Sequence, residues 1–125
     1  MATHREMELR PRSSAPALAR RLVYDACGDA GLPNRMAHAA AQVAGELVLT
    51  SIRQTRRNVD VSVDLARNQV TVRVSDRGTA PPLLGHDTRT GPARATALVE
   101  RLASSWGYSC REDGNEVWAL LRTPK

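Results

Sequence analysis

The stretch VDVSVDLARNQVTVRV, residues 59–74, decides the fold of this chain. A valine or leucine stands at every second position from 59 to 65 and from 70 to 74, with polar residues between them. This period of two is typical of strands that bury one face and expose the other. Arg67, Asn68 and Gln69 separate the two runs and supply the residues of a turn. The stretch therefore predicts an antiparallel hairpin.

A long amphipathic helix is predicted immediately before this hairpin, from Arg35 to about Thr55. Side chains suited to a core recur there at steps of three or four: Met36, Ala40, Val43, Leu47 and Ser51. Such spacing places them on one face of a helix. The helix ends in the basic cluster of Arg53, Arg56 and Arg57, which suits the negative end of a helix dipole.

The N-terminal part predicts a shorter helix and a strand. The helix runs from about Pro16 to Asp29. Its inward residues are expected to be Leu18, Leu22 and Cys27, supported by Val23 and Ala26. Gly31 ends it, and Asn34 is expected to cap the long helix that follows. Before these helices, residues 6–11 predict a short edge strand, and residues 1–5 are expected to be a disordered lead.

The C-terminal part predicts a loop, a helix and a second hairpin. Residues 77–91 are rich in Pro and Gly and are expected to form a mobile, lid-like loop. A helix follows over about residues 93–104, with Ala95, Leu98, Val99 and Leu102 inward. A strand begins near Trp106, turns at residues 113–115 and returns over residues 117–121. The whole chain, 1–125, is thus expected to be one α+β domain. Its architecture would be a two-layer sandwich of a mostly antiparallel sheet, about five strands wide, with three helices on one face.

Composition restricts the function classes. The net charge of +5 comes almost entirely from arginine and favours an acidic partner such as a nucleotide, nucleic acid or acidic protein face. Nucleic-acid binding is the weaker reading, because the chain has no zinc motif, no helix-turn-helix string and no series of stacking aromatics. No apolar run is long enough to span a bilayer, and the polar first twelve residues lack the apolar stretch of a signal peptide. Cys27 and Cys110 have no metal-like spacing, and both are expected to pack as small apolar groups. We therefore expect a cytoplasmic protein with two free thiols and no membrane partner.

Several strings, in this order, resemble the GHKL superfamily, also called the Bergerat or histidine-kinase-like ATPase fold. They read GELVLTSIR at residues 45–53, VRVSDRG at 72–78, ALVERLASSWG at 97–107 and GNEVW at 114–118. The most similar group is the RsbW-type anti-sigma-factor serine kinases and related small regulatory proteins. The resemblance covers about residues 7–122.

The resemblance implies roles for two residues of the long helix. In the family, a Glu acts on the attacking water or hydroxyl, and an Asn four residues later holds Mg²⁺. Glu46 matches the Glu and would be the catalytic residue. Thr50 stands at the Asn position and would be the metal ligand, with a shorter reach than Asn. The spacing of four places both side chains on one helix face.

The resemblance also implies a nucleotide-binding set. Asp76 matches an Asp that accepts a hydrogen bond from the adenine amino group, and Gly78 matches a Gly that lets the base approach. A glycine-rich turn that wraps the triphosphate corresponds to residues 91–96, which read GPARAT. Proline lacks an N–H donor and alanine disfavours the conformations that glycine allows. Arg94 could still meet a phosphate.

By resemblance, the expected cofactors are ATP and Mg²⁺, with binding weak or absent because the phosphate and metal positions are altered. The expected function is that of an anti-sigma-factor-like regulator in a bacterial partner-switching system of transcription regulation, acting by protein binding. The alternative is an active ATP-dependent serine/threonine kinase that phosphorylates an STAS-domain anti-sigma antagonist. The expected partners are a sigma factor or an STAS-domain protein, and the family often forms homodimers.

Overall fold

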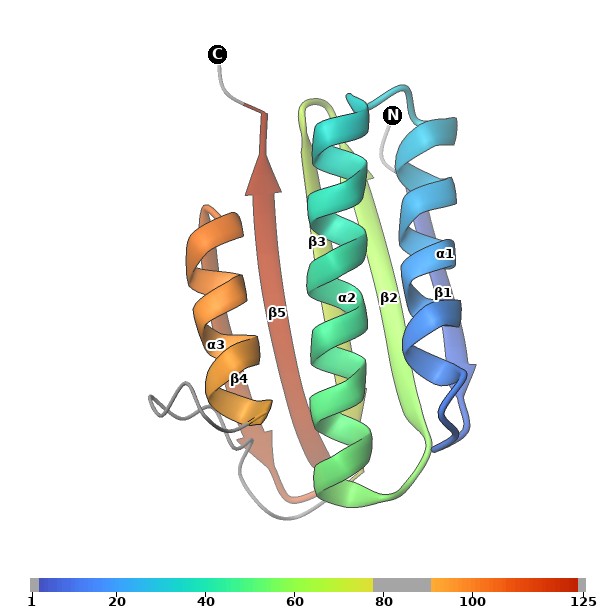
Figure 1. Cartoon of the computed structure of the whole chain (residues 1–125), viewed down its shortest axis with the longest axis vertical. Coiled ribbons are helices and arrows are strands. Elements are labelled where there is room, and N and C mark those ends of the chain that lie inside the picture. The colour runs from blue at the N-terminus through green and yellow to red at the C-terminus, as the bar shows by residue number, and fades with distance from the viewer. Residues whose placement is uncertain (1–2, 78–90, 124–125) are drawn as a thin grey trace.

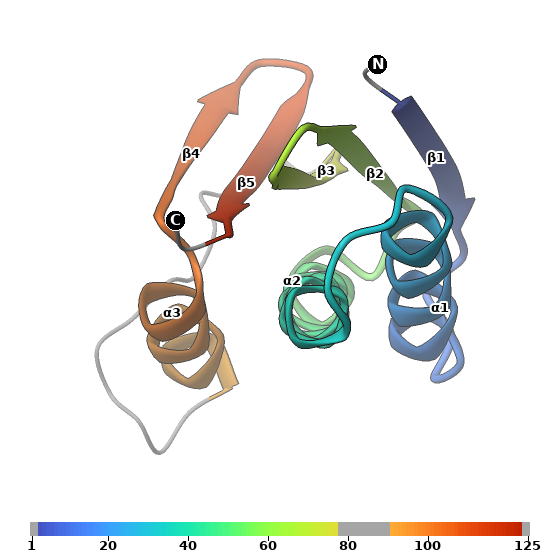
Figure 2. The ribbon, with the colours of Figure 1, turned by 90° about the horizontal axis from the view of Figure 1, so that it is seen from above.

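The chain folds into a layer of helices and a layer of strands, as Figures 1 and 2 show. The computed structural model describes residues 3–77 and 91–123. The described elements are β1 Thr3–Leu9, α1 Ala15–Asp29, α2 Asn34–Thr55, β2 Val59–Ala66, β3 Gln69–Asp76, α3 Gly91–Leu102, β4 Ser105–Arg111 and β5 Gly114–Arg122. The sheet has the order β1-β2-β3-β5-β4, and each neighbouring pair is antiparallel. The prediction of an α+β two-layer sandwich is confirmed.

The β2–β3 hairpin forms the centre of the core. Val61 pairs with Val74 and Val63 with Val72, and all four side chains are buried. The turn is tighter than predicted, since Gln69 already belongs to β3. The buried valines lie against α2, whose core side chains are mainly small or β-branched: Ala40, Val43, Ala44, Leu47 and Val48. Small helix residues let α2 approach the sheet closely, so a core without phenylalanine can still pack densely.

The inward stripe of α1 differs from the predicted one. Leu18 is 44% exposed, whereas Ala19, Val23 and Ala26 are fully buried. The predicted positions Val23 and Ala26 are thus confirmed, whereas Leu18 faces outward and Ala19 is buried instead, because a small side chain allows closer contact with α2 than leucine would. Cys27 is buried as predicted, and Leu22 packs partly against the core.

Several element ends also differ from the predictions. Strand β1 begins at Thr3, so residues 3–5 belong to the sheet and not to a disordered lead. Asn34 is the first residue of α2 rather than its cap, and its Oδ1 accepts a hydrogen bond from the Tyr24 hydroxyl at 3.2 Å. Both cysteines are free, but Cys110 is exposed and does not pack as an apolar group. Within the described residues, no helix combines the length and apolar character needed to cross a membrane. The expected lid-like loop was residues 77–91. Residues 78–90 lie outside the described residues, and Gly91 is already the first residue of α3.

Gly114 opens β5 with φ +148°, which a side chain tolerates poorly. A Cβ at this position would overlap the backbone carbonyl oxygen of Asp76. Gly114→Ala should therefore destabilise the fold by about 2–4 kcal/mol, measured by urea unfolding.

The matched control is Gly28→Ala in α1, where a new Cβ has no heavy atom within 4 Å. It should stabilise the chain by about 0.5–1 kcal/mol, because alanine favours a helix over glycine. Equal effects of the two substitutions would contradict the strain assigned to Gly114.

Candidate functional site

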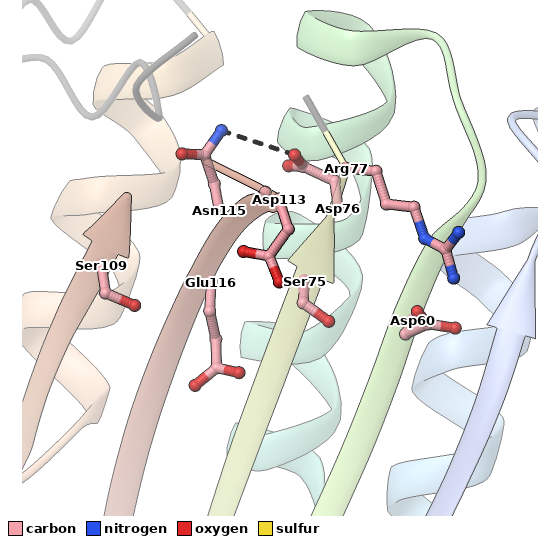
Figure 3. A pocket seen from close by; sticks show the side chains of 9 residues that line it. Asp60, Ser75, Asp76, Arg77, Ser109, Asp113, Asn115 and Glu116 are labelled. Atoms are coloured by element: carbon pink, nitrogen blue, oxygen red, sulfur yellow. Dashed lines mark hydrogen bonds between the residues drawn. The ribbon is translucent and has the colours of Figure 1, made fainter. Parts of the chain in front are cut away.

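Asp76 lies at the end of β3, where the sheet meets the C-terminal half of α2. Its carboxylate accepts a hydrogen bond from Ser51 Oγ of α2 at 2.8 Å and one from Asn115 Nδ2 of β5 at 3.4 Å. Asn115 is also the direct cross-strand partner of Asp76 in the sheet (Figure 3). Three elements thus hold this carboxylate, and its orientation is set by the fold.

Ser51 and Asn115 were not recognised as members of the site from the sequence. Both donate hydrogen bonds to the partly buried carboxylate of Asp76. Ser51 is 9% exposed and Asn115 is 3% exposed. Buried polar side chains are retained where hydrogen bonds satisfy them. A signal for Ser51 was present, because a serine stood at a position of the buried helix stripe. Asn115 stands in the GNEVW string, but nothing local indicated its contact with Asp76, which depends on the pairing of β3 with β5.

Thr50 and Asp76 line the same small cavity between α2 and the sheet, so the structure brings together two of the residues singled out from the sequence. The remaining lining residues are Leu47, Ser51, Gln54, Val74, Asn115 and Val117. The volume of this cavity is about 20 Å³. That is room for one water molecule and not for a purine ring. As described, the cavity offers an acceptor of the right kind for an amino group but too little space for a base.

Glu46 lines a different cavity from Thr50 and Asp76. It is half-buried one turn before Thr50 and lines a cavity of about 260 Å³ between α2 and α3. The other residues of that lining are Gln42, Ala97, Leu98 and Arg101. The residues that line this cavity do not include Asp76, and those beside Asp76 do not include Glu46. The carboxylates of Glu46 on α2 and Asp76 on β3 therefore line separate cavities.

The proposed phosphate-binding residues are only partly placed. Gly78 and the side chain of Arg94 lie outside the described residues. The backbone of residues 91–96, the counterpart of the glycine-rich turn, is already helical, because α3 begins at Gly91 and not near residue 93. Pro92 explains the earlier start, since its fixed φ suits the first turn of a helix. The helix N-terminus still supplies N–H groups, but from a regular turn instead of a glycine-rich loop.

Possible metal ligands do not cluster in the described part of the chain. Within residues 3–77 and 91–123, no three His, Cys, Asp or Glu side chains are grouped so that they could hold a metal ion. Beside Thr50, Asp76 supplies the one carboxylate of the cavity lining. The arrangement therefore presents a fixed hydrogen-bond acceptor at the end of a narrow cavity, and the sequence position expected to hold Mg²⁺ offers a hydroxyl.

The comparisons with known proteins give no family assignment. The sequence matches no protein-family model, and no curated protein is significantly similar to it.

The hydrogen bond from Ser51 to Asp76 can be tested by Ser51→Ala. The substitution leaves a partly buried carboxylate with one donor fewer, so the free energy of unfolding should fall by about 1–3 kcal/mol. Ser13→Ala, at an exposed position before α1, is the control and should change it by less than about 0.5 kcal/mol. Equal values for the two variants would show that Ser51 does not hold Asp76.

Proposed function

We propose that this chain is an anti-sigma-factor-like regulator of a bacterial partner-switching system, which acts by binding a protein partner and has weak or no ATP binding. The proposal starts from the resemblance of four ordered strings to the GHKL superfamily. The order strand, helix, long helix, hairpin, helix, hairpin supports it, as does the position of Asp76 at a strand end beside the long helix.

The observation that carries the loss of ATP binding is the space beside Asp76. The carboxylate of Asp76, the proposed adenine acceptor, is held by Ser51 and Asn115, and its cavity on the helical side has room for about one water molecule. The wider cavity of about 200 Å³ that Asp76 also lines is bordered by Asp60, Asp113 and Glu116, whose charges would repel the phosphates of a nucleotide. A purine could enter only if Thr50, Gln54 or the sheet side chains moved, which costs packing energy. The altered turn at residues 91–96 should also weaken ATP binding, because Pro92 has no N–H group to donate to a phosphate.

The expected loss is large enough to matter. Each missing donor or ligand should cost about 1–3 kcal/mol. The total binding free energy of a micromolar ligand is only about 8 kcal/mol. Losses at the metal position Thr50 and at two positions of the phosphate turn together approach that value, so nucleotide should not control partner binding.

This function predicts which proteins the chain captures. A tagged full-length chain should co-purify with a sigma factor or an STAS-domain protein from a bacterial lysate, identified by mass spectrometry. The amount recovered should be the same with and without added ATP and Mg²⁺. Recovery of neither protein would contradict the proposal, and recovery that depends on nucleotide would contradict the loss of ATP binding.

The alternative function is an active serine kinase, favoured by the half-buried Glu46 on the same helix as Thr50. It predicts transfer of the ATP γ-phosphate to an STAS-domain protein and a loss of at least about 100-fold in Glu46→Gln. Gln42→Ala, in the same cavity one turn earlier, is the control and should retain the activity. We expect no transfer with the unmodified chain, and transfer sensitive to Glu46 would establish the kinase instead.

A further inference from the structure

One face of the sheet is covered by the helices, and the other face has no described element over it (Figure 2). Strand register identifies the side chains on this open face, because residues paired across strands share a face. They are His4, Glu6 and Glu8 of β1, Asp60, Ser62 and Asp64 of β2, Thr71, Arg73 and Ser75 of β3, Glu116, Trp118, Leu120 and Arg122 of β5, and Ser105, Gly107 and Ser109 of β4.

Negative charge dominates one end of this open face, although the chain as a whole carries a net charge of +5. Glu8 and Asp60 are directly opposite each other on β1 and β2, and Glu6 is nearby on the same face. Like charges directly opposite in a sheet are destabilising. Burial, with repulsion from Glu8 and Glu6, raises the pKa of Asp60, while Arg77 acts against this shift. The folded chain therefore tolerates an electrostatic cost at this place.

Other charges of the open face are paired within the molecule. Asp64 lies 2.6 Å from His4 Nδ1 and 2.7 Å from Arg73 Nη1, and Arg73 Nε lies 3.8 Å from Glu116. Glu6 lies 3.4 Å from His4 Nε2. By contrast, among the side chains that the structure describes, no cation forms an ion pair with Asp60 or Asp113. The ion pairs of Arg5 and Arg21 lie on the helical side.

Asp60, Asp113 and Glu116, together with Asp76, border a cavity at the end of the open face. Its volume is about 200 Å³, and its lining is Asp60, Ser75, Asp76, Arg77, Ser109, Asp113, Gly114, Asn115 and Glu116. Figure 3 shows the Asp113 carboxylate between Glu116 and Ser75, with Asp60 across β3 and the Arg77 side chain on the Asp60 side. The cavity is large enough for a planar cationic group and is bordered by acceptors on more than one strand.

We propose that the acidic face, defined as Glu8, Asp60 and Asp113 with the internally paired Glu6 and Glu116 beside them, is a docking surface for an arginine-bearing segment of a protein partner. Charge complementarity identifies this occupant. A basic segment would be repelled by the molecule as a whole, so it can bind only where negative charge is concentrated. Binding would also relieve the repulsion between Glu8 and Asp60.

Arginine fits this surface better than lysine. A guanidinium donates two parallel hydrogen bonds to a carboxylate and also stacks on aromatic rings. Half-buried Trp118 lies on the same face, where a Cβ at Gly107 would be only 2.9 Å from Trp118 Cζ2. Gly107 thus leaves room for the indole of Trp118 against β4.

The direct test is titration of the full chain with a short fluorescent arginine-rich peptide at low salt, followed by fluorescence anisotropy and by amide NMR shifts. We expect binding, with shifts concentrated in β1, β2 and the start of β5. The double variant Glu8→Gln with Asp60→Asn should bind about tenfold more weakly, since two charge pairs are lost. The same variant should melt no lower than the unmodified chain, because a repulsion is removed.

The matched control is Asp25→Asn with Glu100→Gln, which removes two exposed negative charges from the helical side. It should bind the peptide like the unmodified chain. Absence of binding, equal weakening by both double variants, or shifts centred on the helices would overturn the proposal.

A second copy of this chain is the other occupant to consider. If Glu8→Gln with Asp60→Asn changes the sedimentation coefficient of the chain alone, the acidic face binds another copy and the proposal is wrong. Docking of an arginine-bearing segment on the acidic face rests on the proposed function in one respect: both require a protein partner. A failed peptide titration would leave the sigma-factor and STAS-domain captures unaffected, and failed captures would leave the peptide result standing.

Discussion

The burial of the valine face of β2 and β3 under α2 is the interaction on which the rest of the structure depends. Because side chains alternate across a strand, a slip of one residue would turn Val61, Val63, Val72 and Val74 to solvent. The register that buries them also brings Asp76 to the helical side at the end of β3. There it reaches Ser51 of α2, which faces the core for the same reason. The candidate site is thus a consequence of the packing that stabilises the fold.

The elements with strong local periodicity could be predicted from the sequence. The β2–β3 hairpin and α2 appear in the structure within a few residues of the predicted bounds. Leu18 was placed inward because leucine is usually buried, but the alanine and valine stripe of α1 packs closer to its neighbours. Strand β1 could not be traced to Thr3, since its polar first residues join the sheet only through pairing with β2.

Part of the candidate site could also be predicted from the sequence, and part could not. Asp76 and Thr50 could be chosen from the strings that resemble the GHKL superfamily, and the structure brings them to one cavity. Asn115 could not be chosen, because its contact with Asp76 arises from strands almost forty residues apart in the chain. The volume beside Asp76 also depends on how Leu47, Val74 and Val117 pack together, which no local pattern reveals.

The two faces of the sheet present different chemistry. On the helical side, Asp76 lines a space of about one water molecule. Asp76 also lines the wider cavity around which carboxylates of the open face collect. A narrow space beside Asp76 suits a domain that has lost its nucleotide, whereas an exposed charged face suits binding to another protein. Both features support a regulator that works by protein contact.

We infer that this chain keeps an adenine-type acceptor but does not bind ATP effectively. Calorimetric titration of the full chain with ATP and Mg²⁺ is the direct test. We expect no binding heat, or only a weak response at millimolar nucleotide. A dissociation constant in the micromolar range that is lost in Asp76→Asn would contradict it.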